Sequence, residues 1–213
     1  MPKNPCPLCH RPDPDNYLQN KLRSFLQCRG CGFIFVPRQF HLSAQQEKAE
    51  YDLHENSNDD PGYRNFLRRM VPEVTSRVSS GATGLDFGCG PCPVLAQLFQ
   101  EQHFNMKVFD KFYFADPAVF RMKFDFITAT EVFEHLADPA AQISRLWNIL
   151  KSNGVLAVMT KRAADKARFA NWHYIRDLTH IGFFSEQSLN YLADTLNSEL
   201  LLPQNDIALF IKK

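Results

Sequence analysis

Apolar runs and helically spaced apolar positions alternate along the second half of the chain. The runs at 84–87, 105–110, 124–129 and 155–160 read as buried strands. Residues 94–100 (VLAQLFQ) and the stripe Ile143, Leu146, Trp147 and Leu150 have helical spacing between them. A helix near 185–196 and strands at 198–203 and 205–213 follow. This alternation predicts an α/β fold.

Two amphipathic or polar segments precede this region. Residues 41–62 are polar and include a helix expected from Ser43, its N-cap, to Leu53. The helix expected over 63–78 contains Pro72, which predicts a kink or a break. We therefore predict three parts: a module at 1–40, a linker or lid segment at 41–62, and a main domain at 63–213.

The composition changes this picture little. The formal net charge is +1, which gives no whole-chain signal for nucleic acid or an anionic membrane. No apolar run reaches the roughly 20 residues needed to span a bilayer, and residues 1–10 do not read as a secretory signal. We expect a cytoplasmic protein whose thiols are reduced.

All six cysteines fall in C-x-x-C pairs. Two pairs, Cys6/Cys9 and Cys28/Cys31, have the arrangement of a structural zinc site, in which two turns supply four thiolates. Disulfides or buried free thiols are the alternatives. Since four thiolates leave zinc no open position, we predict a structural Zn²⁺ in a ribbon-like module.

The third pair lies in a glycine turn, GLDFGCGPCP (84–93), between a predicted strand and helix. Strand, glycine turn and helix open a nucleotide-binding α/β unit. A dinucleotide fingerprint would need glycine where Pro93 stands. Cys89 and Cys92 could form a redox pair at a helix N-terminus. The third interpretation is a site for S-adenosylmethionine (SAM).

The turn resembles motif I of class I SAM-dependent methyltransferases, D/E-x-G-x-G-x-G. Asp86, Gly88 and Gly90 match, and Cys92 replaces the third glycine. The resemblance covers residues 63–213 and implies a Rossmann-like seven-stranded sheet whose last strand is antiparallel. The whole chain also resembles bacterial methyltransferases with an N-terminal four-cysteine zinc ribbon. In that group a motif matching Tyr51, His54, Asn56, Gly62 and Tyr63 joins the two parts.

The resemblance implies a set of cofactor-binding residues. Asp110, at the end of the second strand, would accept the ribose hydroxyls, and Phe112 and Phe114 would lie near adenine or pack in the core. The full expected set is Asp86, Gly88, Cys89, Gly90, Asp110, Phe112 and Glu131.

The segment TATEVFEHL (128–136) places Glu131, Glu134 and His135 on one face if it is helical. The pattern E-x-x-E-H resembles that of two metal-dependent methyltransferase families, one acting on small RNAs and one on catechols in ubiquinone biosynthesis. This resemblance implies a second divalent-metal site at Glu131, Glu134, His135 and the downstream His180. Alternatively, His180 or His135 is a general base without a metal, or none of these residues takes part in the reaction.

We therefore expect a SAM-dependent methyltransferase that acts on a hydroxylated small molecule, most simply by O-methyl transfer. The aromatic-rich residues Trp172, His173, Tyr174, Phe183 and Phe184 could wall the acceptor pocket or could pack in the core. RNA methylation, with the zinc ribbon contacting RNA, is the second hypothesis. A non-catalytic SAM-binding protein with a partner-docking module is the third. The oligomeric state is not predicted.

Overall fold

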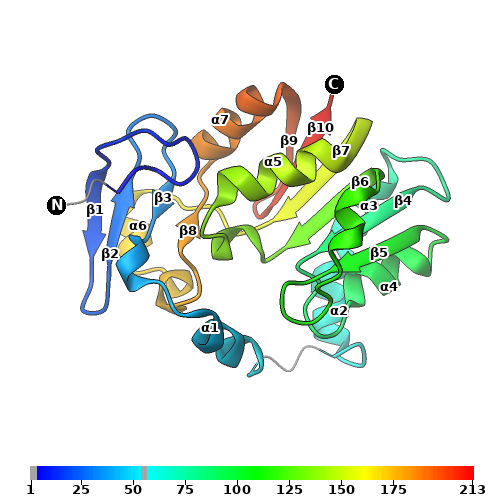
Figure 1. The fold of residues 1–213 in the computed structure, drawn as a ribbon, viewed down its shortest axis with the longest axis horizontal. Coiled ribbons are helices and arrows are strands. Elements are labelled where there is room, and N and C mark those ends of the chain that lie inside the picture. The colour runs from blue at the N-terminus through cyan, green and yellow to red at the C-terminus, as the bar shows by residue number, and fades with distance from the viewer. Residues whose placement is uncertain (1–3, 54–56) are drawn as a thin grey trace.

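A six-stranded mixed sheet forms the centre of the computed structural model, which describes residues 4–53 and 57–213 (Figure 1). Its order is β5-β4-β6-β7-β10-β9. The strands are β4 (Thr83–Phe87), β5 (Asn105–Phe109), β6 (Phe124–Thr130), β7 (Leu150–Met159), β9 (Ser198–Gln204) and β10 (Ile207–Lys212). The first four run parallel, and β10 is antiparallel to both of its neighbours. The predicted α/β fold and the antiparallel last strand are confirmed.

The prediction of seven strands is wrong for the described residues, which form six strands in this sheet. The missing strand would lie in residues 111–123, between β5 and β6. This segment instead forms a bridge between Asp110 and Phe114 and the 3-10 helix η2 (Pro117–Arg121). It is too short to hold a strand together with a crossover helix, for which a dozen or more residues are needed.

Helices cover both faces of the sheet because its strands alternate apolar side chains between the faces. On one face, α5 (Pro139–Ile149) and α7 (Glu186–Leu196) pack against residues such as Ile127 and Leu156. On the other face, α2 (Pro61–Arg68), α3 (Met70–Thr75) and α4 (Val94–Gln100) pack against Phe126 and Val155. The predicted caps are confirmed at Asp138, with Pro139 in the first turn, and at Ser185.

The break between α2 and α3 shows how proline acts on a helix. A kink or a break was predicted within 63–78, and the structure has a break, with two helices that meet at Arg69. The ring of Pro72 would clash with the carbonyl four residues earlier, at Arg68. The α2 helix ends at that residue, and Pro72 lies in the first turn of α3.

The N-terminal module is a second, smaller sheet. Its strands β1 (Asp15–Gln19), β2 (Ser24–Gln27) and β3 (Ile34–Phe35) continue into β8 (Gly182–Phe183), a strand that follows α6 (Lys166–Ala170) and η4 (His173–Arg176). Because β8 pairs with β3, the module's sheet includes residues far beyond the predicted boundary at residue 40. The three-part division itself stays a prediction.

The segment between the module and α2 contains η1 (Arg38–Phe40) and α1 (Ala44–Tyr51). Ser43 caps α1 through a capping box with Gln46, as predicted. Two residues of the expected joining motif, His54 and Asn56, lie outside the described residues. Within residues 4–53 and 57–213, every helix is too short or too polar to cross a membrane.

Candidate functional site

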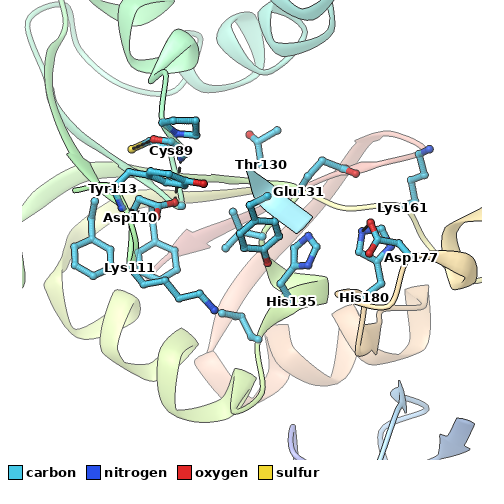
Figure 2. Close-up of a pocket in the computed structure, with 18 of the residues that line it drawn as sticks. Cys89, Asp110, Lys111, Tyr113, Thr130, Glu131, His135, Lys161, Asp177 and His180 are labelled. Carbon is cyan, nitrogen blue, oxygen red and sulfur yellow. Dashed lines mark hydrogen bonds and ion pairs between the residues drawn. The ribbon is translucent and has the colours of Figure 1, made fainter. Parts of the chain in front are cut away.

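A cavity of about 480 Å³ opens at the carboxyl ends of β4, β5 and β6. In a parallel sheet this edge, where the strand order reverses between β4 and β6, is the usual place for a ligand. Figure 2 shows Cys89, Asp110 and Tyr113 on one side of the cavity and His135, His180, Asp177 and Lys161 on the other, with Glu131 between them. The remaining lining residues are Tyr51, Tyr63, Phe87, Gly88, Gly90, Pro91, Phe109, Lys111, Thr130, Val132, Leu136, His173 and Tyr174.

The predicted glycine turn forms one wall of this cavity. Gly88 and Gly90 have φ values of 77° and 66°, a region that side chains other than glycine's rarely adopt. A Cβ at Gly88 would overlap the side chain of Val132, whereas a Cβ at Gly90 would meet no atom within 4 Å. Gly88 therefore permits close packing of two loops, and Gly90 leaves bare backbone facing open space.

Asp110 lies directly beside this turn. Its Oδ2 accepts a hydrogen bond from the Gly90 amide at 3.1 Å, and its Oδ1 accepts from the amides of Phe112 and Tyr113 at 2.8 and 3.2 Å. These contacts fix the carboxylate at the end of β5, where it lines the cavity. The structure thus brings Gly88, Cys89, Gly90, Asp110 and Glu131 together.

Two residues of the expected cofactor set do not line the cavity. Asp86 is fully buried, its Oδ1 accepts from Thr128 Oγ1 at 2.9 Å, and burial raises its pKa to about 6. Phe112 packs edge-on against Tyr51 at 5.9 Å between ring centroids, and its neighbour Tyr113 lines the cavity instead. Phe114, the alternative adenine neighbour, is also outside the lining.

The redox interpretation of Cys89 and Cys92 finds no support in their surroundings. Cys89 is buried, and this burial raises the pKa of its thiol. Reactive cysteines need the opposite shift, because the thiolate is the nucleophile. Cys92 packs beside the α2–α4 core and does not line the cavity. Cys89 is better described as a small wall residue.

The segment 128–136 is not one helix, so the expected shared helical face is wrong. Glu131 follows β6 with a left-handed φ of 51°, and only Phe133–His135 forms a 3-10 turn, η3. The Glu131 amide is held by the carbonyl of Met159 at 2.8 Å. The reversal at Glu131 turns its side chain into the cavity, while Glu134 points into the protein and is fully buried.

Glu134 nevertheless meets both histidines. Ligand atoms of Glu134, His135 and His180 all lie within 4.8 Å of one another. Glu134 Oε1 accepts a hydrogen bond from the hydroxyl of Tyr174, and its buried Oε2 has no partner among the described residues. Three of the four residues expected in a second metal site therefore gather in one place, and Glu131 is not part of that group.

Hydrogen bonds to backbone carbonyls orient both imidazoles. His135 Nδ1 lies 3.0 Å from the carbonyl of Thr179, and His180 Nδ1 lies 2.8 Å from that of Tyr174. A carbonyl can only accept, so each Nδ1 carries the hydrogen and each Nε2 keeps its lone pair. His180 Nε2 is 3.6 Å from Asp177 Oδ2.

Burial shifts the pKa values of the two glutamates and the two histidines away from their ordinary values. Desolvation, together with mutual repulsion, raises the pKa of Glu131 to about 8, and desolvation raises that of Glu134 to about 7. Desolvation also lowers the pKa of His135 and of His180 to about 4. Near neutral pH the histidines are therefore uncharged, and the two carboxyl groups retain about one proton between them.

The side chains of Glu134, His135 and His180 offer donor atoms that suit a divalent cation. Two imidazole nitrogens with free lone pairs and an unpartnered carboxylate oxygen suit Zn²⁺, Mn²⁺ or Fe²⁺ rather than Mg²⁺, which prefers oxygen. The carbonyls of Thr179 and Tyr174 orient the rings in the way that outer partners of metal-bound histidines do.

The four cysteines of the module also form a group suited to a metal. The Sγ atoms of Cys6 and Cys31 are 3.6 Å apart, and those of Cys9 and Cys28 are 3.4 Å apart. These separations exceed the roughly 2.05 Å of a disulfide, and they match the edge of a tetrahedron around Zn²⁺ with Zn–S bonds of about 2.3 Å. The cysteine group is compatible with the predicted zinc site.

Several lining residues were not predicted. Lys161, Lys111 and Asp177 come from loops without a recognisable motif, and Tyr51 comes from the helix α1. Tyr51 packs edge-on against His135 at 5.3 Å, so α1 covers the histidine side. The Lys111 Nζ bonds Glu47 at 2.7 Å and ties α1 to the Asp110 loop. Two sequence features did point toward this region. Of the aromatic-rich set in 172–184, His173 and Tyr174 line the cavity, and of the joining motif, Tyr51 and Tyr63 do.

The fold and the bare glycine turn beside an acidic strand end define a SAM-dependent methyltransferase of the Rossmann-like class. Residues 59–202 match the family model described as a methyltransferase domain, and the chain belongs to that family. The expected enzyme class is confirmed at this level.

The individual relatives are distant. The ubiquinone biosynthesis O-methyltransferase of Histophilus somni (strain 2336) is 29% identical over 102 residues, which are 46% of this chain and 43% of that protein. This chain thus matches less than half the length of that relative.

Among solved structures, an O-methyltransferase family protein from Burkholderia thailandensis has a TM-score of 0.53 at 15% identity, covering 82% of this chain and 64% of that one. The 1,6-didemethyltoxoflavin-N1-methyltransferase of the same organism, with bound S-adenosylhomocysteine, has a TM-score of 0.51 at 14% identity and covers 93% and 99%. These likenesses confirm the fold.

We predict that Gly90→Ala lowers the affinity for the cofactor and costs little stability. A left-handed φ costs alanine about 1–2 kcal/mol, and the new methyl group would occupy the space that backbone leaves open. Calorimetric titration with S-adenosylhomocysteine should show affinity reduced roughly tenfold or more, equivalent to about 1.4 kcal/mol.

Gly81→Ala is the matched control. Gly81 also has a left-handed φ (77°), and a Cβ added there would meet no atom within 4 Å, yet the residue lies outside the cavity. The variant should show the same loss of stability and normal affinity. Equal affinity of the two variants would remove Gly90 from the cofactor site.

A second prediction concerns pH: Glu134→Gln should stabilise the protein at pH 8 and have little effect at pH 4. Burial raises the pKa of Glu134 to about 7, so the folded state retains a proton that the unfolded chain releases from about pH 4.5 upward. Stability of the parent therefore falls as pH rises through this window. Glutamine does not ionise and should recover about 1–3 kcal/mol in urea unfolding at pH 8.

The histidines titrate in both proteins alike, so their opposite slope, a loss of stability as pH falls from about 6.5 to 4, cancels in the difference. Exposed Glu199→Gln provides the control and should change nothing. If Glu134→Gln proved less stable than the parent at pH 8, the carboxylate would be stabilised there, as a bound divalent cation would do.

Proposed function

We propose that this protein transfers the methyl group of SAM to a hydroxyl oxygen of a small molecule. The observation that carries the proposal is the wall opposite the glycine turn, where Glu131 and His180 present proton-accepting groups to the cavity. A hydroxyl must lose its proton as its oxygen is methylated, and such groups bind and remove that proton. The similarity to an O-methyltransferase over 102 residues supports the same chemistry.

The cofactor would lie along the glycine turn. The bare backbone of Gly88 and Gly90 permits its close approach, and the Asp110 carboxylate would accept hydrogen bonds from its ribose hydroxyls. SAM supplies an electrophilic methyl group on a sulfonium. Expected contacts of Asp86 and Phe112 with the cofactor stay predictions, since neither residue lines the cavity. Asp86 instead accepts a hydrogen bond from Thr128 of β6 in the core beneath the turn.

On the acceptor side, we assign proton removal to His180. Its Nε2 keeps a free lone pair, and the imidazolium formed by protonation would face Asp177 Oδ2 at 3.6 Å. A pKa of about 4 leaves the ring unprotonated above about pH 5. The Glu131–Glu134 pair, whose pKa values lie near neutrality, can then take up the proton.

A divalent cation is the alternative to this scheme, because the one free lone pair of His180, on Nε2, cannot both bind a metal and remove a proton. Glu134, His135 and His180 would hold it, and it would lower the pKa of a bound acceptor hydroxyl. The zinc proposed for Cys6, Cys9, Cys28 and Cys31 has a different role, because four thiolates complete its coordination and leave it structural.

The cavity volume and the module both favour a small acceptor over RNA. About 480 Å³ lies in the ordinary range for small-molecule pockets. In the module, Arg23 is buried and Arg29 is paired with Asp15, so neither is arranged as a free phosphate contact. RNA methylation and non-catalytic SAM binding are kept as outcomes of the test.

The test is label transfer from methyl-labelled SAM. The zinc-loaded protein should label a hydroxylated compound in a low-molecular-weight extract, and addition of Mn²⁺ or Mg²⁺ shows whether a cation contributes. Label in total RNA instead would contradict the proposal. Binding of S-adenosylhomocysteine without label in either pool would identify a non-catalytic binding protein.

With an acceptor in hand, His180→Asn should lower kcat by roughly 10²–10⁴-fold. Affinity for S-adenosylhomocysteine should stay the same, because His180 lies across the cavity from the glycine turn (Figure 2). His103→Asn, at an exposed position with a left-handed φ of 65° that asparagine tolerates, is the control. A kcat within about threefold of the parent would remove His180 from proton transfer.

A further inference from the structure

Arg23 is a buried arginine whose guanidinium lies over Phe25 of its own module but makes its hydrogen bonds outside that module. It is 3% exposed, directly before β2, and burial lowers its pKa to about 10. Its guanidinium donates to three carbonyls: Nη1 to Leu178 at 3.1 Å, and Nη2 to Ile175 at 2.9 Å and Asp177 at 2.6 Å. Burying a guanidinium is costly, and the hydrogen bonds to these three carbonyls offset part of that cost.

The three carbonyls belong to the segment that forms the acceptor side of the cavity. Tyr174, Asp177 and His180 line the cavity from this segment, which comprises η4 and the residues between η4 and β8 and pairs in neither sheet. Since its carbonyls lack strand partners there, Arg23 supplies the donors that hold the segment. The fork of a guanidinium can contact several acceptors at once, which a lysine ammonium cannot reproduce with the same geometry.

Backbone hydrogen bonds extend the same link to the glutamates. The Val36 amide of the module donates to Ile181 O at 2.9 Å, and the Ile181 amide donates to Glu134 O at 2.8 Å. One residue thus joins the module to the turn that carries Glu134 and His135. Module and acceptor wall are held together at both ends of the 175–181 segment.

We propose that Arg23 is a positioning residue for methyl transfer: its contacts with the carbonyls of 175–178 hold His180 and Asp177 in the orientation that the acceptor requires. The four-cysteine module is therefore part of the acceptor side of the active site. This inference rests on the proposed function for its kinetic consequence. Its structural consequence, the orientation of His180, can be measured without any acceptor.

The experiment compares Arg23→Lys and Arg23→Met with Arg29→Met in the whole, zinc-loaded chain. Arg29 lies in the same module but is exposed and contacts only Asp15 among the partners described, so it controls for general effects on the module. The measurements are affinity for S-adenosylhomocysteine, histidine ring NMR signals across pH, and kcat and KM for an acceptor found by label transfer.

Both Arg23 variants should lower kcat roughly tenfold or more while cofactor affinity stays within about twofold. The ring signals of His180 should shift in both variants, because either substitution removes the guanidinium that holds the carbonyls of residues 175–178. Arg29→Met should match the parent in every measurement.

Parent-like kcat and histidine signals in Arg23→Met would overturn the proposal, as would equal losses in Arg29→Met. If the methionine variant lost its zinc or failed to fold, the lysine variant would decide, since it keeps the charge and removes the fork. Failure of the proposed function has a different signature: no cofactor binding or no labelled acceptor in the parent, with the histidine signals still responsive to Arg23.

Discussion

The pairing of β3 with β8 is the contact on which the acceptor side of this protein depends. Gly182 and Phe183 complete the module's sheet, only two residues after His180. Phe184, next in the chain, is buried between Phe33 of the module and Phe133 of the η3 turn, with ring centroids 4.8 and 5.8 Å away. A short stretch therefore belongs to the small sheet, the main core and the cavity wall. The module cannot move far without moving that wall.

This arrangement stabilises a cluster that would otherwise be unfavourable. Glu134 is buried, Glu131 is half-buried close to it, and Glu131 has a left-handed backbone at φ 51°. Each feature costs on the order of 1–3 kcal/mol, and such costs persist where the surrounding structure enforces them and function uses them. The neutral histidines beside the glutamates add no compensating positive charge. The nearest compensation is Lys161, which favours the charged form of Glu131.

The sequence predicted well what depends on local pattern. Alternating apolar runs located the strands, and the spacing of Asp86, Gly88, Gly90 and Asp110 predicted the turn and the acidic strand end that form the cofactor wall. The prediction of seven strands came from the resemblance. The sheet has six because residues 111–123 are too few to form a further strand and its connections. Phe112 lies outside the cavity lining because Asp110 accepts hydrogen bonds from the two following amides, and Tyr113, one residue later, lines the cavity instead.

The histidine side could be predicted only in part, for a physical reason. His135 and His180 were chosen from a motif, and they do meet. Glu131 and Glu134 diverge because Glu131, directly after β6, has a left-handed conformation that turns the chain. Nothing in the local sequence marks Arg23, since its role comes from carbonyls about 150 positions away. Long-range backbone contacts of this kind leave no periodic signal in the chain.

Family membership accounts for one side of the cavity and not for the other. The family match covers 59–202 and includes the glycine turn and Asp110, so it accounts for the cofactor. It leaves out the module, whose Arg23 and Val36 hold the segment that carries Tyr174, Asp177 and His180. A site's choice of substrate follows from the groups that shape its pocket. Because a part outside the family domain holds the wall that we propose for the acceptor, the search for the acceptor should start from that wall and from the module that supports it.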